Sequence, residues 1–153
     1  MGISAETAIT NLLYRYGEAI DAGRFEDLAT GLFARCRFVV APPPAPAIDA
    51  TAMVDLLCRT TIRHEDGTPH TKHVITNPII ELGADQATAT CRSVYVVYQQ
   101  TATVPLQPIV AGRYHDRFAL VDGAWCFTER DYTLVDLVGD VGDHLRGGLA
   151  APR

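Results

Sequence analysis

The chain has 153 residues, of which 48% are hydrophobic and 20% are charged, and its net charge at pH 7 is -5. This length suits a single domain that buries ~70% of the surface of the unfolded chain. The acidic balance and the lack of any basic cluster argue against a nucleic acid or an anionic membrane as partner.

The four cysteines are widely spaced and form no CxxC pair, which argues against a zinc knuckle or a redox motif. They are Cys36, Cys58, Cys91 and Cys126. The first residues lack the layout of a signal peptide, and no apolar run approaches ~18 residues. We therefore expect a cytoplasmic protein with reduced thiols and no membrane span.

The N-terminal third predicts three helices separated by a strand. Ser4 is placed to cap a first helix whose apolar residues recur at three- and four-residue steps until Gly23. A short second helix follows at 25–32, then the strand CRFVV and the proline-rich loop APPPAPA. Asp49 is placed to cap the third helix.

The remainder predicts four strands, at 70–82, 86–99, 109–121 and 124–133. Asp122-Gly123 between the last two is a strong hairpin signal. Helices followed by strands indicate an α+β fold, with the helices on one side of a curved antiparallel sheet. We expect one domain over 1–153, with 1–4 and the glycine-rich 140–153 flexible or forming a flap.

His73 and Asn77 are polar residues on a strand face that is otherwise apolar, because side chains alternate along a strand. A half-buried imidazole can carry protons near neutral pH. The alternative is a core histidine that is hydrogen-bonded to the backbone. Metal binding is disfavoured, since the nearby His64 and His70 do not share one face with His73.

Asp21 lies in the last turn of the first helix, where the helix dipole disfavours a carboxylate by ~0.3–1 kcal/mol. A residue that breaks a local rule is a candidate functional residue, although a solvated acid at a helix end costs little. Tyr14 lies on the same helix face as Asp21, and Tyr16 belongs to the apolar stripe of the helix. Either tyrosine can point into a cavity, and core packing is the alternative for both.

The strand at 109–121 carries two further pocket candidates, Gly112 and Tyr114, on its apolar face, where a glycine beside a tyrosine leaves room for a ligand. Arg113, His115 and Arg117 share the opposite face. A two-residue hairpin turn pairs Arg130 with His115 on that charged face, unless a bulge intervenes.

Three segments together resemble the SnoaL-like branch of the nuclear transport factor 2 superfamily. They are NLLYRYGEAIDAGRFEDLATGLF, TKHVITNPIIELGADQATAT and GRYHDRFALVDGAWCFTER. The resemblance implies a cone-shaped sheet wrapped around helices, with a pocket between them. Dehydratases of this superfamily use an aspartate–histidine pair at positions that match Asp21 and His73, and their polar pocket residue matches Tyr16.

The same resemblance implies a substrate contact from Arg130. We also expect Phe33 and Tyr98 to contact the substrate, and we expect no cofactor or metal. We expect a lyase, dehydratase-like, that acts on a mostly apolar ring-bearing small molecule. A polyketide cyclase or isomerase and a non-catalytic ligand-binding module are the alternatives. We also expect a homo-oligomer, a dimer or a trimer, because a bent sheet leaves an outer face that needs cover.

Overall fold

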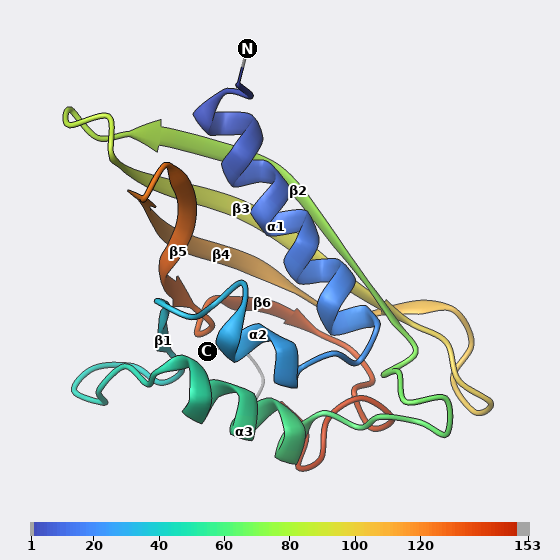
Figure 1. The fold of residues 1–153 in the computed structure, drawn as a ribbon. Coiled ribbons are helices and arrows are strands. Elements are labelled where there is room, and N and C mark those ends of the chain that lie inside the picture. The colour runs from blue at the N-terminus through green and yellow to red at the C-terminus, as the bar shows by residue number, and fades with distance from the viewer. Residues whose placement is uncertain (1, 150–153) are drawn as a thin grey trace.

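The computed structural model describes residues 2–149, which form three helices and six strands in an α+β arrangement (Figure 1). The helices are α1 (Ala5–Asp21), α2 (Glu26–Thr30) and α3 (Ala50–Thr60). The strands are β1 (Arg37–Val39), β2 (Thr71–Leu82), β3 (Thr88–Gln99), β4 (Gln107–Val121), β5 (Ala124–Asp131) and β6 (Val135–Val138). The predicted fold class and the order of elements are confirmed.

The helix ends follow from capping chemistry. The Ser4 hydroxyl accepts the Thr7 N–H at 3.2 Å, and the Asp49 carboxylate accepts the Ala52 N–H at 2.9 Å. Gly23 ends α1 with a φ of +70°, a conformation that costs glycine little. The helix α2 is shorter than predicted, because residues 31–35 form turns beyond it.

The sheet has the strand order β1-β5-β4-β3-β2, and β6 pairs with β4. The hairpin between β4 and β5 is confirmed: Asp122 and Gly123 both have positive φ, as a two-residue turn of this kind requires. The sequence predicted a purely antiparallel sheet, but β1 runs parallel to β5, so the sheet is mixed. The strand β6, in the tail, was not predicted.

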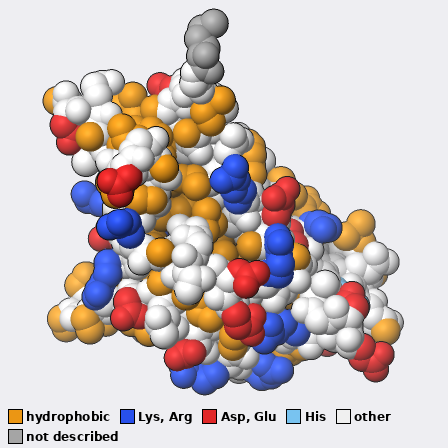
Figure 2. All heavy atoms as spheres, viewed as in Figure 1, with side chains coloured by type: hydrophobic (Ala, Val, Ile, Leu, Met, Phe, Trp, Pro, Cys, Tyr) orange, Lys and Arg blue, Asp and Glu red, His pale blue; other side chains and the backbone are white. Residues whose placement is uncertain are grey.

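The core lies between α1 and the inner face of the sheet, which α1 crosses obliquely (Figure 1). Ile9, Leu13, Tyr16 and Ile20 of α1 are buried there, as their spacing predicts. Acidic and basic side chains are interspersed over the face seen in Figure 2, without a large patch of one sign. No helix within residues 2–149 is long and apolar enough to cross a membrane.

Two bulges overturn predictions that assumed regular strands. In β2 the pairing with β3 shifts between Thr76 and Ile79, and Asn77 has a φ of +53°. Asn77 is therefore exposed and does not share the His73 face. Between β4 and β5 the pairing shifts between Arg117 and Phe118, so Arg130 pairs with Asp116 instead of His115. Arg130 therefore enters the inner face.

The tail lies along the end of α3, where the Ile62 N–H donates to the His144 carbonyl at 2.8 Å (Figure 1). Opening of this segment as a flap stays a prediction. Met1 and residues 150–153, which belong to the segments predicted to be flexible, lie outside the described residues.

Candidate active site

A cavity of about 300 Å³ lies between α1, α3, the inner face of the sheet and the tail. Its volume is within the range of small-molecule sites. Most of the wall is apolar, formed by residues such as Ile20, Val40, Met53, Leu56, Leu57, Val97, Val110 and Val135. The polar side chains on it are the rings of Tyr16, Tyr95, Tyr114, Tyr132, His73 and His144, together with Thr60, Thr61 and Arg146. The cavity therefore suits a largely apolar molecule with a few oriented polar groups.

Asp21 and His73 meet at this wall. The His73 Nδ1 lies 2.7 Å from Asp21 Oδ1, and the two side chains are only 6% and 9% exposed. The His73 backbone N–H donates to the other carboxylate oxygen at 2.9 Å, and the Thr71 hydroxyl donates to Oδ1 at 2.9 Å. These three bonds supply the compensation that a carboxylate at the C-terminal end of a helix requires.

The contacts also set the charge of the acid. Burial alone would raise the pKa of the Asp21 carboxyl, but the hydrogen bonds and charge of His73, with the Thr71 hydroxyl, outweigh it. The net pKa lies below its usual value, so Asp21 is a carboxylate at neutral pH. A carboxylate that accepts the Nδ1 proton orients the ring and leaves the Nε2 lone pair free. Since His73 lines the cavity, that lone pair is available as a base.

Four tyrosines form the wall next to His73. The Tyr132 hydroxyl donates to the Tyr16 hydroxyl oxygen at 2.9 Å, which leaves the Tyr16 proton free to donate elsewhere. Tyr95 stacks on Tyr114 with ring centroids 4.4 Å apart. Burial raises the pKa of Tyr95 to about 12, and it also raises the pKa values of Tyr114 and Tyr132 well above the usual value of a phenol. These phenols remain protonated and act as neutral donors.

Arg130 lies behind the tyrosines and is fully buried. Its guanidinium carbon is 4.3 Å from the Tyr16 ring centroid and 4.0 Å from that of Tyr114. Two bonds of 2.7 and 2.8 Å join it to Asp116. It is not among the residues that line the cavity, so the interpretation of Arg130 as a substrate contact is corrected: it supports the rings that form the wall.

Other residues predicted to bind substrate lie away from this cavity. Tyr14 is 47% exposed on the outer side of α1, and Tyr98 is 36% exposed on the outer face of β3. Phe33 is buried in the core against Phe38 and Phe127. The space beside Gly112 is filled by the Tyr95 ring and the Leu134 carbonyl, so it holds no ligand. Tyr16, His73 and Tyr114 do line the cavity, with Asp21 behind His73.

Six polar lining residues were missed from the sequence: Thr60, Thr61, Tyr95, Tyr132, His144 and Arg146. Strand alternation could have identified Tyr95, because it shares a face with the buried Val97, whereas Tyr98 does not. Tyr132 follows the end of β5, and His144 lies in a glycine-rich tail without periodicity. The sequence carried no signal for either.

Within residues 2–149, no group of three or more His, Cys, Asp or Glu side chains is arranged to hold a metal ion. Burial raises the pKa of Cys36 to about 12 and that of Cys91 to about 11. These two thiols therefore lack the thiolate character of a nucleophile.

The sequence profile of the SnoaL-like domain family matches residues 2–131. A search of curated proteins finds no match. Among solved structures, the β subunit of an assigned aromatic-ring-hydroxylating dioxygenase from Novosphingobium aromaticivorans superposes with a TM-score of 0.67. It is 22% identical, over 92% of this chain and 95% of that one.

Two further structures share the fold. A protein assigned as a scytalone dehydratase, also from Novosphingobium aromaticivorans, has a TM-score of 0.65 and 23% identity, over 90% of this chain and 93% of that one. ActVI-ORFA from Streptomyces coelicolor has a TM-score of 0.63 and 17% identity, over 84% of this chain and 96% of that one. These likenesses show the fold alone.

Proposed function

Since this chain belongs to the SnoaL-like domain family, we propose that it is a cofactor-independent lyase that removes water from a mostly apolar, ring-bearing small molecule. The observation that carries this proposal is the 2.7 Å contact between Asp21 and His73 beside the cavity. A shared fold does not decide chemistry, so the argument rests on this pair.

In the proposed reaction, His73 Nε2 removes a proton from the carbon next to a substrate carbonyl. The electron pair moves to the carbonyl oxygen, and the Tyr16 O–H donates a hydrogen bond to the resulting enolate. The enolate then re-forms the carbonyl and expels the hydroxyl group from the adjacent carbon. The protonated His73 returns its proton to this leaving group, which departs as water, and Asp21 stabilises the imidazolium in between.

A panel of cyclic β-hydroxy ketones tests the proposal. The wild type is expected to release product lighter by one water, detected by mass spectrometry, and to exchange the proton next to the carbonyl with deuterated solvent. His73→Gln is expected to slow both by ~10²–10⁴-fold, the usual contribution of a positioned base. The control His115→Gln changes an exposed histidine outside the cavity and is expected to leave both rates unchanged.

The outcomes also separate the alternatives. A cyclase or isomerase would depend on His73 but give a product of unchanged mass. A non-catalytic binding module would bind ring compounds equally well before and after the His73 substitution, with no exchange in either protein. That last result would end the catalytic proposal.

The oligomeric state remains a prediction. Arg113, His115 and Arg117 are exposed on the outer face of β4, where Arg113 pairs with Asp136 and Arg117 with Glu129. Such satisfied charges suit either solvent or the rim of an interface. Sedimentation equilibrium would distinguish a monomer from the expected dimer or trimer.

A further inference from the structure

A second imidazole, that of His144, belongs to the same cavity as His73 but takes no part in the dyad. The residue is 7% exposed and is one of those that line the cavity. Its Nδ1 is buried without a hydrogen-bond partner in the described part of the chain. An unpaired polar atom of this kind is unfavourable, and native proteins rarely leave one unsatisfied without a reason.

The segment around His144 holds the residue in place. The Asp143 carboxylate accepts the Thr101 hydroxyl at 2.6 Å and the Thr103 hydroxyl at 2.8 Å. The Asp143 carbonyl accepts a bond from the Gln99 amide at 3.1 Å. These contacts tie the residue before His144 to the end of β3.

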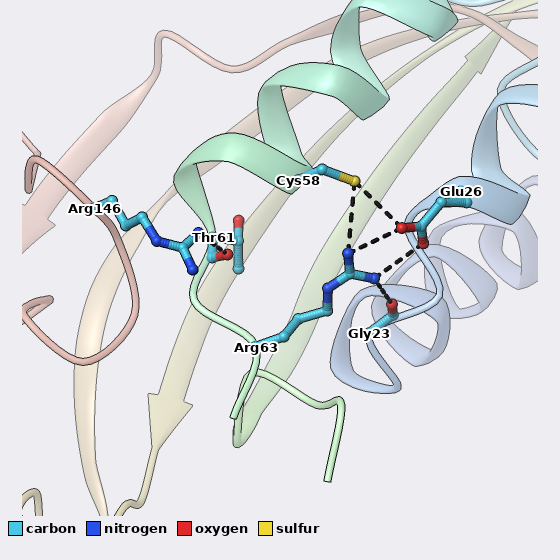
Figure 3. A network of polar contacts seen from close by, with 6 residues as sticks. All are labelled: Gly23, Glu26, Cys58, Thr61, Arg63 and Arg146. Carbon is cyan, nitrogen blue, oxygen red and sulfur yellow. Dashed lines mark hydrogen bonds and ion pairs between the residues drawn. The ribbon is translucent and has the colours of Figure 1, made fainter. Parts of the chain in front are cut away.

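The residues after His144 are tied to the end of α3. The Arg146 N–H donates to the Thr60 carbonyl at 2.7 Å, and the Arg146 guanidinium donates to the Thr61 carbonyl at 3.1 Å (Figure 3). His144 therefore sits on a strap anchored on both sides. Because Nδ1 is itself buried, a ligand in the cavity would bond the ring through its other nitrogen, Nε2.

The ring is neutral under ordinary conditions. Burial, with smaller contributions from the charges of His73 and His64, lowers the pKa of His144 to about 4 against the opposing effect of Asp21. A neutral imidazole offers one N–H donor and one lone-pair acceptor. Its natural partner is an uncharged group such as a hydroxyl or a carbonyl, since a carboxylate would favour the charged form that burial disfavours.

We infer that His144 hydrogen-bonds an uncharged oxygen of the substrate and so selects ring compounds that carry a hydroxyl or carbonyl group besides the one on which His73 acts. This inference rests on the proposed function only in calling the ligand a substrate. What His144 is inferred to determine is which ligands the cavity binds more tightly. It predicts that the cavity prefers an oxygenated ring to its hydrocarbon counterpart, and that His144 supplies much of the preference.

The experiment compares two probes of similar shape, 2-naphthol and naphthalene, by calorimetry. The measured quantity is the ratio of their two Kd values in each variant, which cancels changes that affect all ligands. His144→Phe is expected to reduce the preference for 2-naphthol by about 5-fold, the usual size of one neutral hydrogen bond. His144→Gln, which keeps a donor and an acceptor, is expected to restore most of it.

His64→Phe is the matched control. The His64 ring contacts the Asp143 carbonyl at 3.2 Å and does not line the cavity. The substitution therefore loosens the strap without altering the wall, and the ratio is expected to stay at the wild-type value. An equal ratio in wild type and His144→Phe, an equal fall in His64→Phe, or no binding of 2-naphthol to the wild type would each overturn the inference.

A measurement on the wild type alone covers the case in which His144→Phe does not fold. In protein labelled with ¹⁵N-histidine, 2-naphthol is expected to shift a His144 ring-nitrogen resonance and naphthalene is not. Equal responses to both probes would overturn the inference. The result is independent of the dyad: loss of exchange activity in His73→Gln addresses catalysis, whereas the Kd ratio addresses His144, so either proposal can fail while the other stands.

Discussion

Two carboxylates are buried beside basic side chains in this protein, Asp21 with His73 and Asp116 with Arg130, and they differ in what the partner can do. Asp116 and Arg130 are both fully buried, and a guanidinium does not release its proton. Burial raises the pKa of the Asp116 carboxyl, although the charge of Arg130 acts in the opposite direction. Neither side chain is exposed to solvent. His73 can gain and lose a proton and borders the cavity. The first pair is suited to holding structure and the second to moving protons.

The largest expected effect is on the Asp116–Arg130 pair. Arg130→Met leaves a buried carboxylate without its counter-charge, and the free energy of unfolding in urea should fall by about 3–5 kcal/mol. Adding Asp116→Leu to the same protein should recover much of this loss, because the double variant buries no lone charge. If Arg130→Met alone were as stable as the wild type, Asp116 would have to be in contact with water, which would contradict its assigned burial.

The dyad should respond in rate more than in stability. Asp21→Asn removes the charge that stabilises the His73 imidazolium, and the deuterium exchange rate is expected to fall by ~10²-fold or more. The control Asp136→Asn changes an exposed carboxylate whose pKa is also lowered, by Arg113, and should not alter that rate.

Asp21→Asn should also alter the acid limb of stability. The folded pKa of Asp21 lies below the unfolded value near 3.8, so its stabilising contribution is full above that pH and is lost as the pH falls through the lower, folded pKa. In unfolding experiments between pH 5 and 2, the free energy of unfolding of Asp21→Asn should therefore fall less than that of the wild type. Parallel pH curves for both proteins would contradict the assigned shift.

His144 provides a buried group that has no charged hydrogen-bond partner among residues 2–149. The unfolded chain binds a proton near pH 6.5 that the folded protein accepts only near pH 4, so wild-type stability should decrease as the pH falls between these values. The linked decrease is roughly 3 kcal/mol. His144→Gln should flatten this part of the curve, and His115→Gln, at an exposed site, should not.

The smallest effect is expected for an exposed pair. Arg63 bonds the Glu26 carboxylate at 2.9 and 3.0 Å and the Gly23 carbonyl at 3.1 Å, which joins the ends of α1 and α2 to the segment after α3 (Figure 3). Because these side chains are 34% and 59% exposed, Arg63→Gln should cost about 1 kcal/mol or less. The cost should shrink further in 1 M salt, where charges are screened. A loss of stability as large as that of Arg130→Met would contradict the expected difference between an exposed and a buried ion pair.

Regular elements were predictable because each is set by neighbours in the chain. The caps Ser4 and Asp49 and the Asp122-Gly123 turn act over two to four residues, and the structure shows all three. The dyad was predicted from a rule broken at Asp21 together with a family resemblance. The predicted faces of Asn77 and Arg130 were wrong because a bulge changed the parity: Asn77 left the His73 face, and Arg130 entered the inner face. A bulge inserts one residue and reverses every later side chain, so a small local event has a long-range result.

The sequence by itself determined the α+β order, the stripe of α1 and the positions at which an acid and an imidazole break the local pattern. Tertiary structure alone decided that these two meet at 2.7 Å, that Tyr95 faces the cavity in place of Tyr98, and that a glycine-rich tail brings His144 to the wall. Periodicity and capping depend on contacts within a few residues and are legible in the chain. A cavity is formed by segments far apart in sequence, and their meeting depends on how the whole sheet bends and pairs.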